Sequence, residues 1–589
     1  MDLLVAVVPS TRALPRLSSS CFKGHNPLEE FVERHAAFSF AMLSLFYLAV
    51  VAALSHAKLL WLDELITLHI AQLGSASSIW HALGQAADPN PPLTHLAVLA
   101  SLRLFGNHEF ALRLPAILGY WCGLLSLFLF LRRRLPASWA LAGTILSMAN
   151  AAFDYSYESR SYGIFYGLAM LAVFCWSCAV DPAASTTRRL YLCGMVLALA
   201  AGICTNYFAV LAFFPIAGGE FVRGLQRRRF NRRIWIALAL AATPLLAFHS
   251  LIQVSIHRFA PHAWNKVSID QAFDSYTEMV EVILFPVVAL LLVAAIVYFL
   301  SGLCPHCRSR LRPAWLARLA DAHNQKNDFA FPRHEVAAAF LLMLYPFLGY
   351  LVASIHGGML SPRFVIPVCL GFAIAGVAAA HHVFGRVPHA GSFALVLVFA
   401  TFVGRVCAVG EAYKSQKQCF YQVMQRLSSS PGNQPIAVPD PLMVLTLAHY
   451  APPSIASRIV FPVDFPAIRL FRGEDSPEEN LWAGRSLYHL PIVPLADFQR
   501  STGDYLILAS DGNWMVRDLW NHSYPVNRLP AVFPRGAIKG FTPLDHGDPA
   551  FFVGSGDRSL RAQSRPAPVP FRTQSNLPDS PSLNPSGQL

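Results

Sequence analysis

Long apolar segments recur through the first two-thirds of the sequence, and this feature most limits what the chain can fold into. The first runs from about Ala36 to Ser55, close to the ~20 residues that a helix needs to cross the hydrocarbon core of a bilayer. Only 14% of the residues are charged, whereas soluble domains carry about 25%. The pattern predicts a multi-span membrane protein and excludes disordered, collagen-like and disulfide-rich secreted chains.

We predict about eleven transmembrane helices. After the first, apolar segments lie near Leu114–Leu131, Ala137–Ala152, Tyr162–Val180, Leu190–Ile203, Phe208–Phe221, Ile234–Val254, Val280–Leu303, Val336–Ile355, Phe364–Phe384 and Ser392–Gly410. The apolar stretch from Pro91 to Gly106 is short for a span, so we interpret it as a helix lying at the outer interface. The first external loop then covers residues 56–113, and loops of that length are usually functional.

Arginine-rich loops set the expected orientation. They lie at Arg132–Arg134, Arg188–Arg189, Arg223–Arg233 and Arg308–Arg333, and basic loops stay preferentially in the cytoplasm. The N-terminal segment 1–35 is expected on the same side, and an odd number of spans places the C-terminal part outside. The net charge of +12 is thus explained by topology, and no nucleic-acid partner is expected.

The chain divides into a transmembrane domain and a smaller C-terminal domain. We assign residues 36–410 to the transmembrane part and 411–555 to an extracytoplasmic α+β domain, because strand-like stretches alternate there with Pro and Gly turns. Residues 556–589 are rich in Ser and Pro and are expected to be disordered. The isolated Cys304 and Cys307 pair has no second pair, so it does not by itself predict a zinc site.

Polar residues that could take part in catalysis or binding occur in the loops that we expect on the outer side of the membrane. Asp63 and Glu64 follow the first span directly, and carboxylates at a helix mouth cost desolvation energy unless they are paired or functional. Asp88 precedes a proline-rich turn, which holds its side chain in place. A short loop after the third span contains Glu158 and Arg160.

Each of these residues also has a purely structural interpretation. Asp63 could cap a helix, Asp88 could stabilise the turn that it precedes, and Glu158 could pair with Arg160 within the loop. Arg113 could simply extend to the interface from its helix end. Isolated histidines of the first loop (His69, His81 and His95) are expected at the surface or the membrane interface.

The order of the external motifs resembles the GT-C superfamily of integral membrane glycosyltransferases. The motifs are WLDE from Trp61, DPNPPL from Asp88, FGNHEFALRLP from Phe105 and YSYESRSYG from Tyr155. The most similar members are the bacterial dolichyl-phosphate-mannose-type and aminoarabinose-transferase-like enzymes. The resemblance covers residues 36–220 and extends loosely to the RFVIP segment at Arg363. It implies an all-α polytopic GT-C fold with the small C-terminal domain appended.

The resemblance implies transfer of a sugar from a polyprenyl-phosphate-linked donor to a hydroxyl acceptor. Asp63 matches the family's catalytic acidic residue, so it is expected to act as general base with Glu64 as its neighbour or substitute. Arg160, Arg113 and Arg363 are expected to bind the donor phosphate, since guanidinium groups suit phosphate oxygens. The expected substrate-binding residues are Asp88, Asn90, Tyr157, Tyr162, Asn206 and Tyr207.

Further expectations concern cofactors, acceptors and location. A divalent metal (Mg, Mn or Zn) could bind at Asp88 and Glu158, but family members often have His-Tyr where this chain has Asn206 and Tyr207, which argues against a metal or phosphate role there. The acceptor could be a glycolipid, lipopolysaccharide, polysaccharide or protein. The reaction is expected on the outer face of the cytoplasmic membrane, with the C-terminal domain binding the acceptor or covering the cavity.

A lipid or solute transporter, such as a flippase, is the alternative. A transporter predicts repeated halves and charges near the middle of the membrane. No matched halves are evident, and the ionisable residues lie at the ends of the apolar segments.

Overall fold

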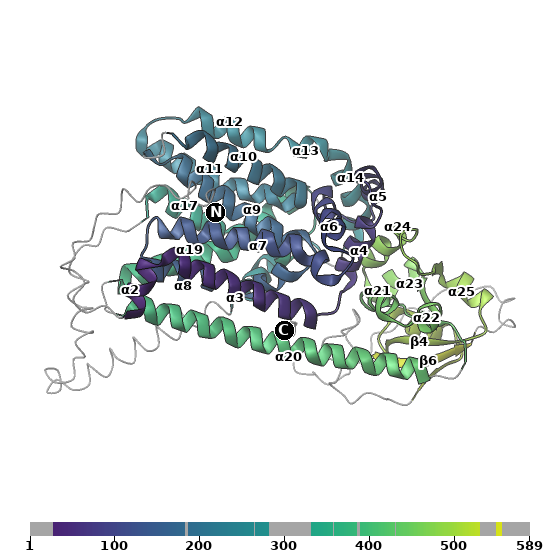
Figure 1. Cartoon of the computed structure of the whole chain (residues 1–589). Helices are drawn as coiled ribbons and strands as arrows, with labels where there is room; N and C mark the ends of the chain where they lie inside the picture. The colour runs from purple at the N-terminus through teal and green to yellow at the C-terminus, as the bar shows by residue number, and fades with distance from the viewer. Residues whose placement is uncertain are drawn as a thin grey trace, which may run out of the picture.

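A bundle of long helices makes up most of the chain, and a mixed α/β domain lies beyond one end of it (Figure 1). The computed structural model describes residues 27–182, 186–263, 265–281, 331–356, 358–385, 389–429, 432–529 and 549–555. The Cys304 and Cys307 pair, nearly all of the span predicted at Val280–Leu303 and the tail 556–589 lie outside these ranges.

The helices of the bundle and its loops follow the apolar segments of the sequence. Their bounds are α2 (Pro27–Arg34), α3 (Ala36–Ala57), α4 (Leu62–Ala71), α5 (Ala76–Gly84), α6 (Pro92–Phe105), α7 (Glu109–Arg132), α8 (Ala137–Leu146), η2 (Ala151–Tyr157), α9 (Ser161–Ala179), α10 (Arg188–Thr205), η4 (Tyr207–Ala212), α11 (Phe213–Arg227), α12 (Arg232–Ala241), α13 (Pro244–Ala247), α14 (His249–Phe259), η5 (Ala260–His262), α17 (Arg333–Met343), α18 (Tyr345–His356), η7 (Pro362–Phe364), α19 (Val368–Phe384) and α20 (Ala390–Ser429).

Within the described residues, 6 helices are long and apolar enough to cross a membrane, or up to 8 if each of two bent pairs counts as one span. The bent pairs are α12–α13 with α14 (58°) and α17 with α18 (61°). Two predicted spans instead contain shorter apolar helices, α8 and α19. The multi-span character is therefore confirmed, while the number of about eleven stays a prediction.

Close packing of α7 against α9 organises the centre of the bundle. A Cβ atom added at Gly167 would lie 1.8 Å from the backbone oxygen of Gly119, and one added at Gly123 would lie 2.9 Å from the Gly167 Cα atom. Pairs of glycines four residues apart let two helix backbones approach in this way. The first turn of α9, which follows Arg160, is thereby fixed beside α7.

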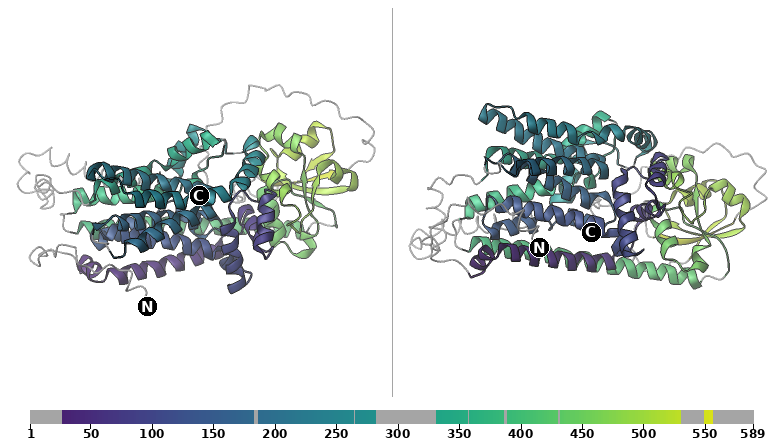
Figure 2. Two further views of the ribbon diagram at one scale, coloured as in Figure 1. Left: turned by 90° about the horizontal axis from the view of Figure 1, so that it is seen from above. Right: turned by 45° about the horizontal axis from the view of Figure 1, so that its top comes forward.

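Short helices close the end of the bundle that faces the C-terminal domain. Figure 2 shows α4, α5 and α6 grouped there, with α6 running across the direction of the long helices. Pro92 occupies the first position of α6, where a proline loses no hydrogen bond. The transverse course of α6 agrees with a helix lying at the interface rather than spanning it.

The helix α20 connects the two parts of the molecule (Figure 1). Its 40 residues correspond to about 60 Å at 1.5 Å per residue, so it continues well beyond Gly410 to reach the sheet. The C-terminal domain contains β1 (Ile436–Ala437), α21 (Pro441–Tyr450), α22 (Pro453–Ala456), β2 (Ile459–Val463), α23 (Phe465–Arg472), α24 (Ser476–Ala483), β3 (Ile492–Pro494), α25 (Leu495–Ser501), β4 (Asp504–Ser510), α26 (Trp514–Asn521), β5 (Val526–Arg528) and β6 (Pro549–Ser555).

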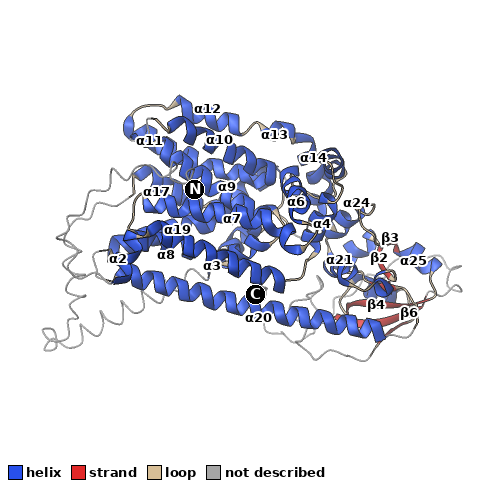
Figure 3. Ribbon diagram, viewed as in Figure 1, coloured by secondary structure: helices blue, strands red, loops and turns tan. Residues whose placement is uncertain are grey.

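A six-stranded sheet in the order β3-β2-β1-β4-β6-β5 forms the core of this domain (Figure 3). The first four strands in that order pair in parallel, and β6 and β5 add antiparallel pairs. Parallel neighbours need crossover connections, which the intervening helices supply. The predicted combination of an all-α membrane part with a small α+β domain is confirmed.

Candidate active site

The helix α4 separates the two carboxylates of the Asp63–Glu64 pair. Both lie in its first turn, where negative charge is favourable. Successive residues on a helix point about 100° apart, so the two side chains face different surroundings. The side chain of Glu64 is 0% exposed, whereas that of Asp63 is 14% exposed.

Asp63 lies between two arginines that the sequence separates widely. Its Oδ2 atom accepts a hydrogen bond from Arg363 Nη1 at 2.8 Å and lies 3.7 Å from Arg160 Nε. Arg160 Nε is buried and makes no hydrogen bond, so one donor beside Asp63 is not used within the protein. We call Asp63, Asp88, Arg160 and Arg363 the acidic cluster.

Asp88 anchors the other side of Arg160. Its Oδ2 atom accepts from Arg160 Nη1 at 2.5 Å, and its Oδ1 atom accepts from the backbone and side-chain nitrogens of Asn90 at 2.9 and 2.7 Å. Burial opposes the charged form, but the Arg160 guanidinium, His95 and the hydrogen bond from the Asn90 backbone together outweigh it and lower the pKa of Asp88. The predicted rigid turn before the prolines therefore holds a charged, fully paired carboxylate.

Hydrogen bonds connect the predicted polar residues around this cluster. Ser161 Oγ donates to Asn90 Oδ1 at 3.2 Å and accepts from Asn206 Nδ2 at 3.0 Å. The ring of Tyr162 lies 5.8 Å from the Arg363 guanidinium carbon, a cation–π distance. Asn90, Tyr162 and Asn206 thus join the acidic cluster, while Tyr207 packs beside Phe248 at a ring distance of 6.3 Å.

Glu64 and Arg113 form a buried ion pair that is separate from the acidic cluster. Arg113 donates from Nε and Nη2 to the two Glu64 oxygens at 2.7 and 2.8 Å. Its other three bonds go to backbone oxygens at the end of α3, those of Ser55, Lys58 and Leu59. All five donors of Arg113 are therefore engaged inside the protein. The base role of Glu64 and the phosphate-binding role of Arg113 stay predictions, and this geometry shows that the two side chains hold each other.

Glu158 pairs with a lysine that the sequence analysis did not identify. Lys58 follows α3 and donates to Glu158 Oε1, and its ammonium lies 5.7 Å from the Tyr157 ring. Burial alone would lower the pKa of Lys58, but Glu158, Tyr413 and Glu64 together raise it. The Tyr157 hydroxyl points elsewhere and donates to Asp154 Oδ1 at 2.8 Å.

Asp88 and Glu158, the predicted metal ligands, are occupied by different cations, Arg160 and Lys58. Among the residues that the structure describes, no group of three or more His, Cys, Asp or Glu side chains is placed to hold a metal ion. A divalent metal at Asp88 and Glu158 therefore stays a prediction.

His95 differs from its expected surface position. It is 1% exposed, and its Nε2 atom lies 3.8 Å from Asp88 Oδ2. The sequence places it three residues after the α6 proline, and only the folding of α6 against α4 brings it beneath Asp88. Lys58 was missed and His95 was misplaced for the same reason, because an isolated lysine or histidine carries no motif.

The C-terminal domain packs directly on the loop that carries the acidic residues. Asn480 Nδ2 donates to Ala87 O at 2.9 Å, next to Asp88. Thr446 Oγ1 donates to Leu60 O at 3.0 Å, and the Tyr450 hydroxyl accepts from Leu60 N at 3.0 Å. The domain thus holds both the segment before Asp63 and the turn containing Asp88.

Comparisons with known proteins give a family match and matches to solved structures. Residues 89–252 match the family described as dolichyl-phosphate-mannose-protein mannosyltransferase, and no curated protein sequence matches the chain. A crystal structure of ArnT from Cupriavidus metallidurans bound to undecaprenyl phosphate aligns at 12% identity and a TM-score of 0.53, covering 90% of this chain and 100% of that one. The apo structure of the same protein aligns at 14% identity and a TM-score of 0.42, with the same coverage.

The chain therefore shares the fold of the ArnT structure, and its residues 89–252, from the Asp88 turn to α14, are similar to the dolichyl-phosphate-mannose-protein mannosyltransferase family.

Proposed function

We propose that this protein transfers a sugar from a polyprenyl-phosphate-linked donor to a hydroxyl acceptor, with Asp63 as the general base. The observation that carries the proposal is the position of Asp63 between Arg363 and Arg160. Asp63 keeps 14% exposure of its side chain, whereas the side chain of Asp88 is 0% exposed. Asp63 is therefore the carboxylate of the acidic cluster that a bound acceptor can reach.

The proposed step forms one bond and breaks another. The acceptor oxygen attacks the anomeric carbon of the donor sugar, and the bond from that carbon to the phosphate oxygen breaks. The acceptor proton passes to the Asp63 carboxylate, and the polyprenyl phosphate leaves with the bonding electron pair. Such transfers pass through an oxocarbenium-like transition state, in which general-base assistance contributes about 10²–10⁴-fold.

The arginines of the acidic cluster would stabilise the leaving phosphate. Charge grows on the phosphate as its bond to the sugar breaks, and preorganised guanidinium groups in a water-poor site stabilise that charge strongly. Arg160 is already fixed by Asp88 and Thr67, so its geometry need not reorganise. Arg363 would exchange part of its contact with Asp63 for the phosphate.

The donor class draws on the ArnT structure, whose description names undecaprenyl phosphate. We place the reaction on the outer face of the cytoplasmic membrane, because the described arginine-rich loops at Arg132–Arg134 and Arg223–Arg233 lie at the other end of the bundle (Figure 1). A hexosyl or a pentosyl donor fits this scheme equally. The acceptor would be a glycolipid, lipopolysaccharide, polysaccharide or protein that reaches Asp63 beside the C-terminal domain.

The experiment is sugar transfer by purified protein in liposomes supplied with radiolabelled polyprenyl-phosphate sugar. Asp63→Asn should reduce transfer about 10²–10⁴-fold at an unchanged protein level and unfolding temperature. Asp497→Asn is the matched control, since Asp497 pairs with Arg500 at the surface. Retained transfer by Asp63→Asn would exclude Asp63 as the base, and lipid movement without any transfer product would favour the transporter alternative.

A further inference from the structure

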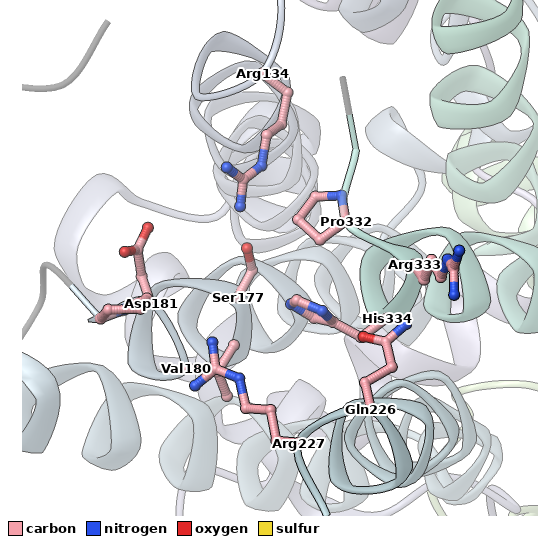
Figure 4. Close-up of a pocket in the computed structure, with 10 residues that line it drawn as sticks. Arg134, Ser177, Val180, Asp181, Gln226, Arg227, Pro332, Arg333 and His334 are labelled. Carbon is pink, nitrogen blue, oxygen red and sulfur yellow. The ribbon is translucent and has the colours of Figure 1, made fainter. Parts of the chain in front are cut away.

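A hollow, shown in close-up in Figure 4, lies at the end of the bundle away from α4 (Figure 1). It has a volume of about 520 Å³ and lies between the ends of α9 and α11 and the start of α17. Arg134, Ser177, His334 and Arg227 surround it in the close-up. A cavity of this size is large enough for a charged headgroup, since ligand pockets begin at about 300 Å³.

A second, smaller hollow adjoins the first. Its volume is about 180 Å³, and it shares Val180, Pro182 and Arg227 with the larger one. It extends between α10, α11 and the start of α12, where Arg188 and Arg233 line it. We call these two neighbouring hollows, with the arginines that line them, the arginine recess.

The carboxylates near the arginine recess are each matched by a specific arginine. Glu335 accepts two hydrogen bonds from Arg134, and Glu220 accepts two from Arg223. Asp181 accepts from Arg133 at 2.6 Å. Within the described ranges, four further arginines that line the recess have no acidic partner: Arg188, Arg227, Arg233 and Arg333. Positive charge therefore exceeds negative charge in a concave site, which favours an anionic occupant.

Apolar side chains continue from the recess along the outside of the bundle. Leu190 and Leu197 of α10 are 64% and 68% exposed, and Ile236 and Leu240 of α12 are 58% and 57% exposed. The rings of Phe230 and Trp235 stack at 5.8 Å beside Arg233, and such aromatic residues mark the level of lipid headgroups. A ligand in the recess therefore has a hydrocarbon-facing surface next to its charged end.

We infer that the arginine recess binds the phosphate headgroup of an anionic phospholipid, with the acyl chains lying along α10 and α12. Orientation by basic loops explains why arginines occur on this side, but it does not require a recess or an excess of unmatched guanidinium groups around one. Basic pockets between transmembrane helices are known to hold anionic headgroups. The site is independent of the proposed sugar transfer.

Lipid titration followed by native mass spectrometry tests the inference on the full-length wild-type protein in detergent. Phosphatidylglycerol or cardiolipin should remain bound under conditions that remove phosphatidylcholine. The variant Arg188→Gln/Arg227→Gln/Arg233→Gln should lower the affinity roughly 100-fold, since each basic residue near a membrane surface contributes about fivefold. The matched control is Arg189→Gln/Arg228→Gln/Arg232→Gln, which removes the neighbouring charges outside the recess.

Three outcomes would overturn the inference. Equal losses in the two triple variants would show that only the overall charge matters, and equal retention of phosphatidylcholine by the wild type would show no headgroup selectivity. Displacement of the lipid by millimolar inorganic phosphate would assign the recess to a soluble anion instead. The selectivity measurement uses the wild type, so it remains decisive even if a variant fails to fold.

Discussion

Arginine side chains have different surroundings at the two ends of the helix bundle. At the end covered by the C-terminal domain, Arg113, Arg160 and Arg363 each contact a carboxylate and lie largely enclosed. At the other end, arginines outnumber the carboxylates and several line a hollow. Enclosed charges must be paired, because an unpaired buried ion costs several kcal/mol. Charged side chains at the end of the bundle that is open to solvent do not need a charged partner.

The comparison suggests what each end can do. Fixed ion pairs in an enclosed site keep guanidinium groups and carboxylates in one geometry, which suits stabilisation of charge that develops during a reaction. Unmatched arginines in an open recess instead favour binding of a stable anion. The predictions below compare equivalent changes at the two ends.

The largest expected effect comes from breaking the enclosed pair. Glu64→Gln should destabilise the protein by about 3–5 kcal/mol, because it leaves the fully buried Arg113 without its counter-charge. Glu335→Gln removes the partner of Arg134, whose side chain is 23% exposed, so we expect a clearly smaller loss. Denaturant unfolding in detergent measures both, and equal losses would contradict the proposed difference between the ends.

Removing a guanidinium from the acidic cluster should affect the reaction more than the fold. Arg363→Gln is expected to lower kcat/KM about 10²–10³-fold, the usual effect of deleting one donor that stabilises developing charge. Arg228→Gln, at the opposite end, should leave kcat/KM unchanged. Arg363→Lys should recover only part of the activity, because an ammonium lacks the planar fork. Full activity of Arg363→Gln would separate this residue from the donor phosphate.

Much of the fold could be predicted from the sequence, because long apolar segments have few alternatives in a bilayer. The bends at Leu344 and Phe248 were not predicted, because each apolar stretch was interpreted as one straight span. Pro346 and Pro244 lie close to these bends, and prolines are a common cause of helix kinks. The extension of α20 beyond Gly410 was also missed. The residues after Gly410 are more polar, so the span was predicted to end there, but the helix continues.

The candidate site was only partly predictable. The motifs identified Asp63, Asp88 and Arg160, which the structure brings together. They could not show that Glu64 faces Arg113 or that Lys58 holds Glu158, since these pairs are 49 and 100 residues apart. Such contacts depend on how α4, α7 and the loop before α9 pack, which local patterns do not encode.

Acidification should lower the stability of the end of the bundle that the C-terminal domain covers, because His69 becomes protonated. Burial, together with His449 and His489 of the C-terminal domain, lowers the pKa of His69 to about 4. Because this folded-state pKa is lower than the ordinary value near 6.5, stability should fall as the pH drops from about 6.5 towards 4, by at most about 1.4 kcal/mol per unit. Thermal unfolding at graded pH measures this loss.

The variant His69→Asn should remove the part of the pH dependence that comes from His69, whereas His81→Asn, at an exposed position of the same loop, should retain it. The loss due to His95, whose pKa burial also lowers to about 4, should remain in both variants. An unchanged slope in His69→Asn would show that acid acts elsewhere. Protease digestion of the C-terminal domain at pH 5 and pH 7 would show whether the loss of stability includes its separation from α4.

The smallest expected effect concerns a single hydroxyl between the C-terminal domain and the first loop. Tyr450 donates to Glu109 and accepts from Leu60 N, so Tyr450→Phe should cost about 1 kcal/mol. Tyr421→Phe is the control, because that ring is 59% exposed on α20. If the domain orders the acceptor side of the site, Tyr450→Phe should raise KM for the acceptor and leave donor hydrolysis unchanged. Equal changes in both would mean that the domain supports the whole cluster, since the Leu60 bond lies only three residues before Asp63.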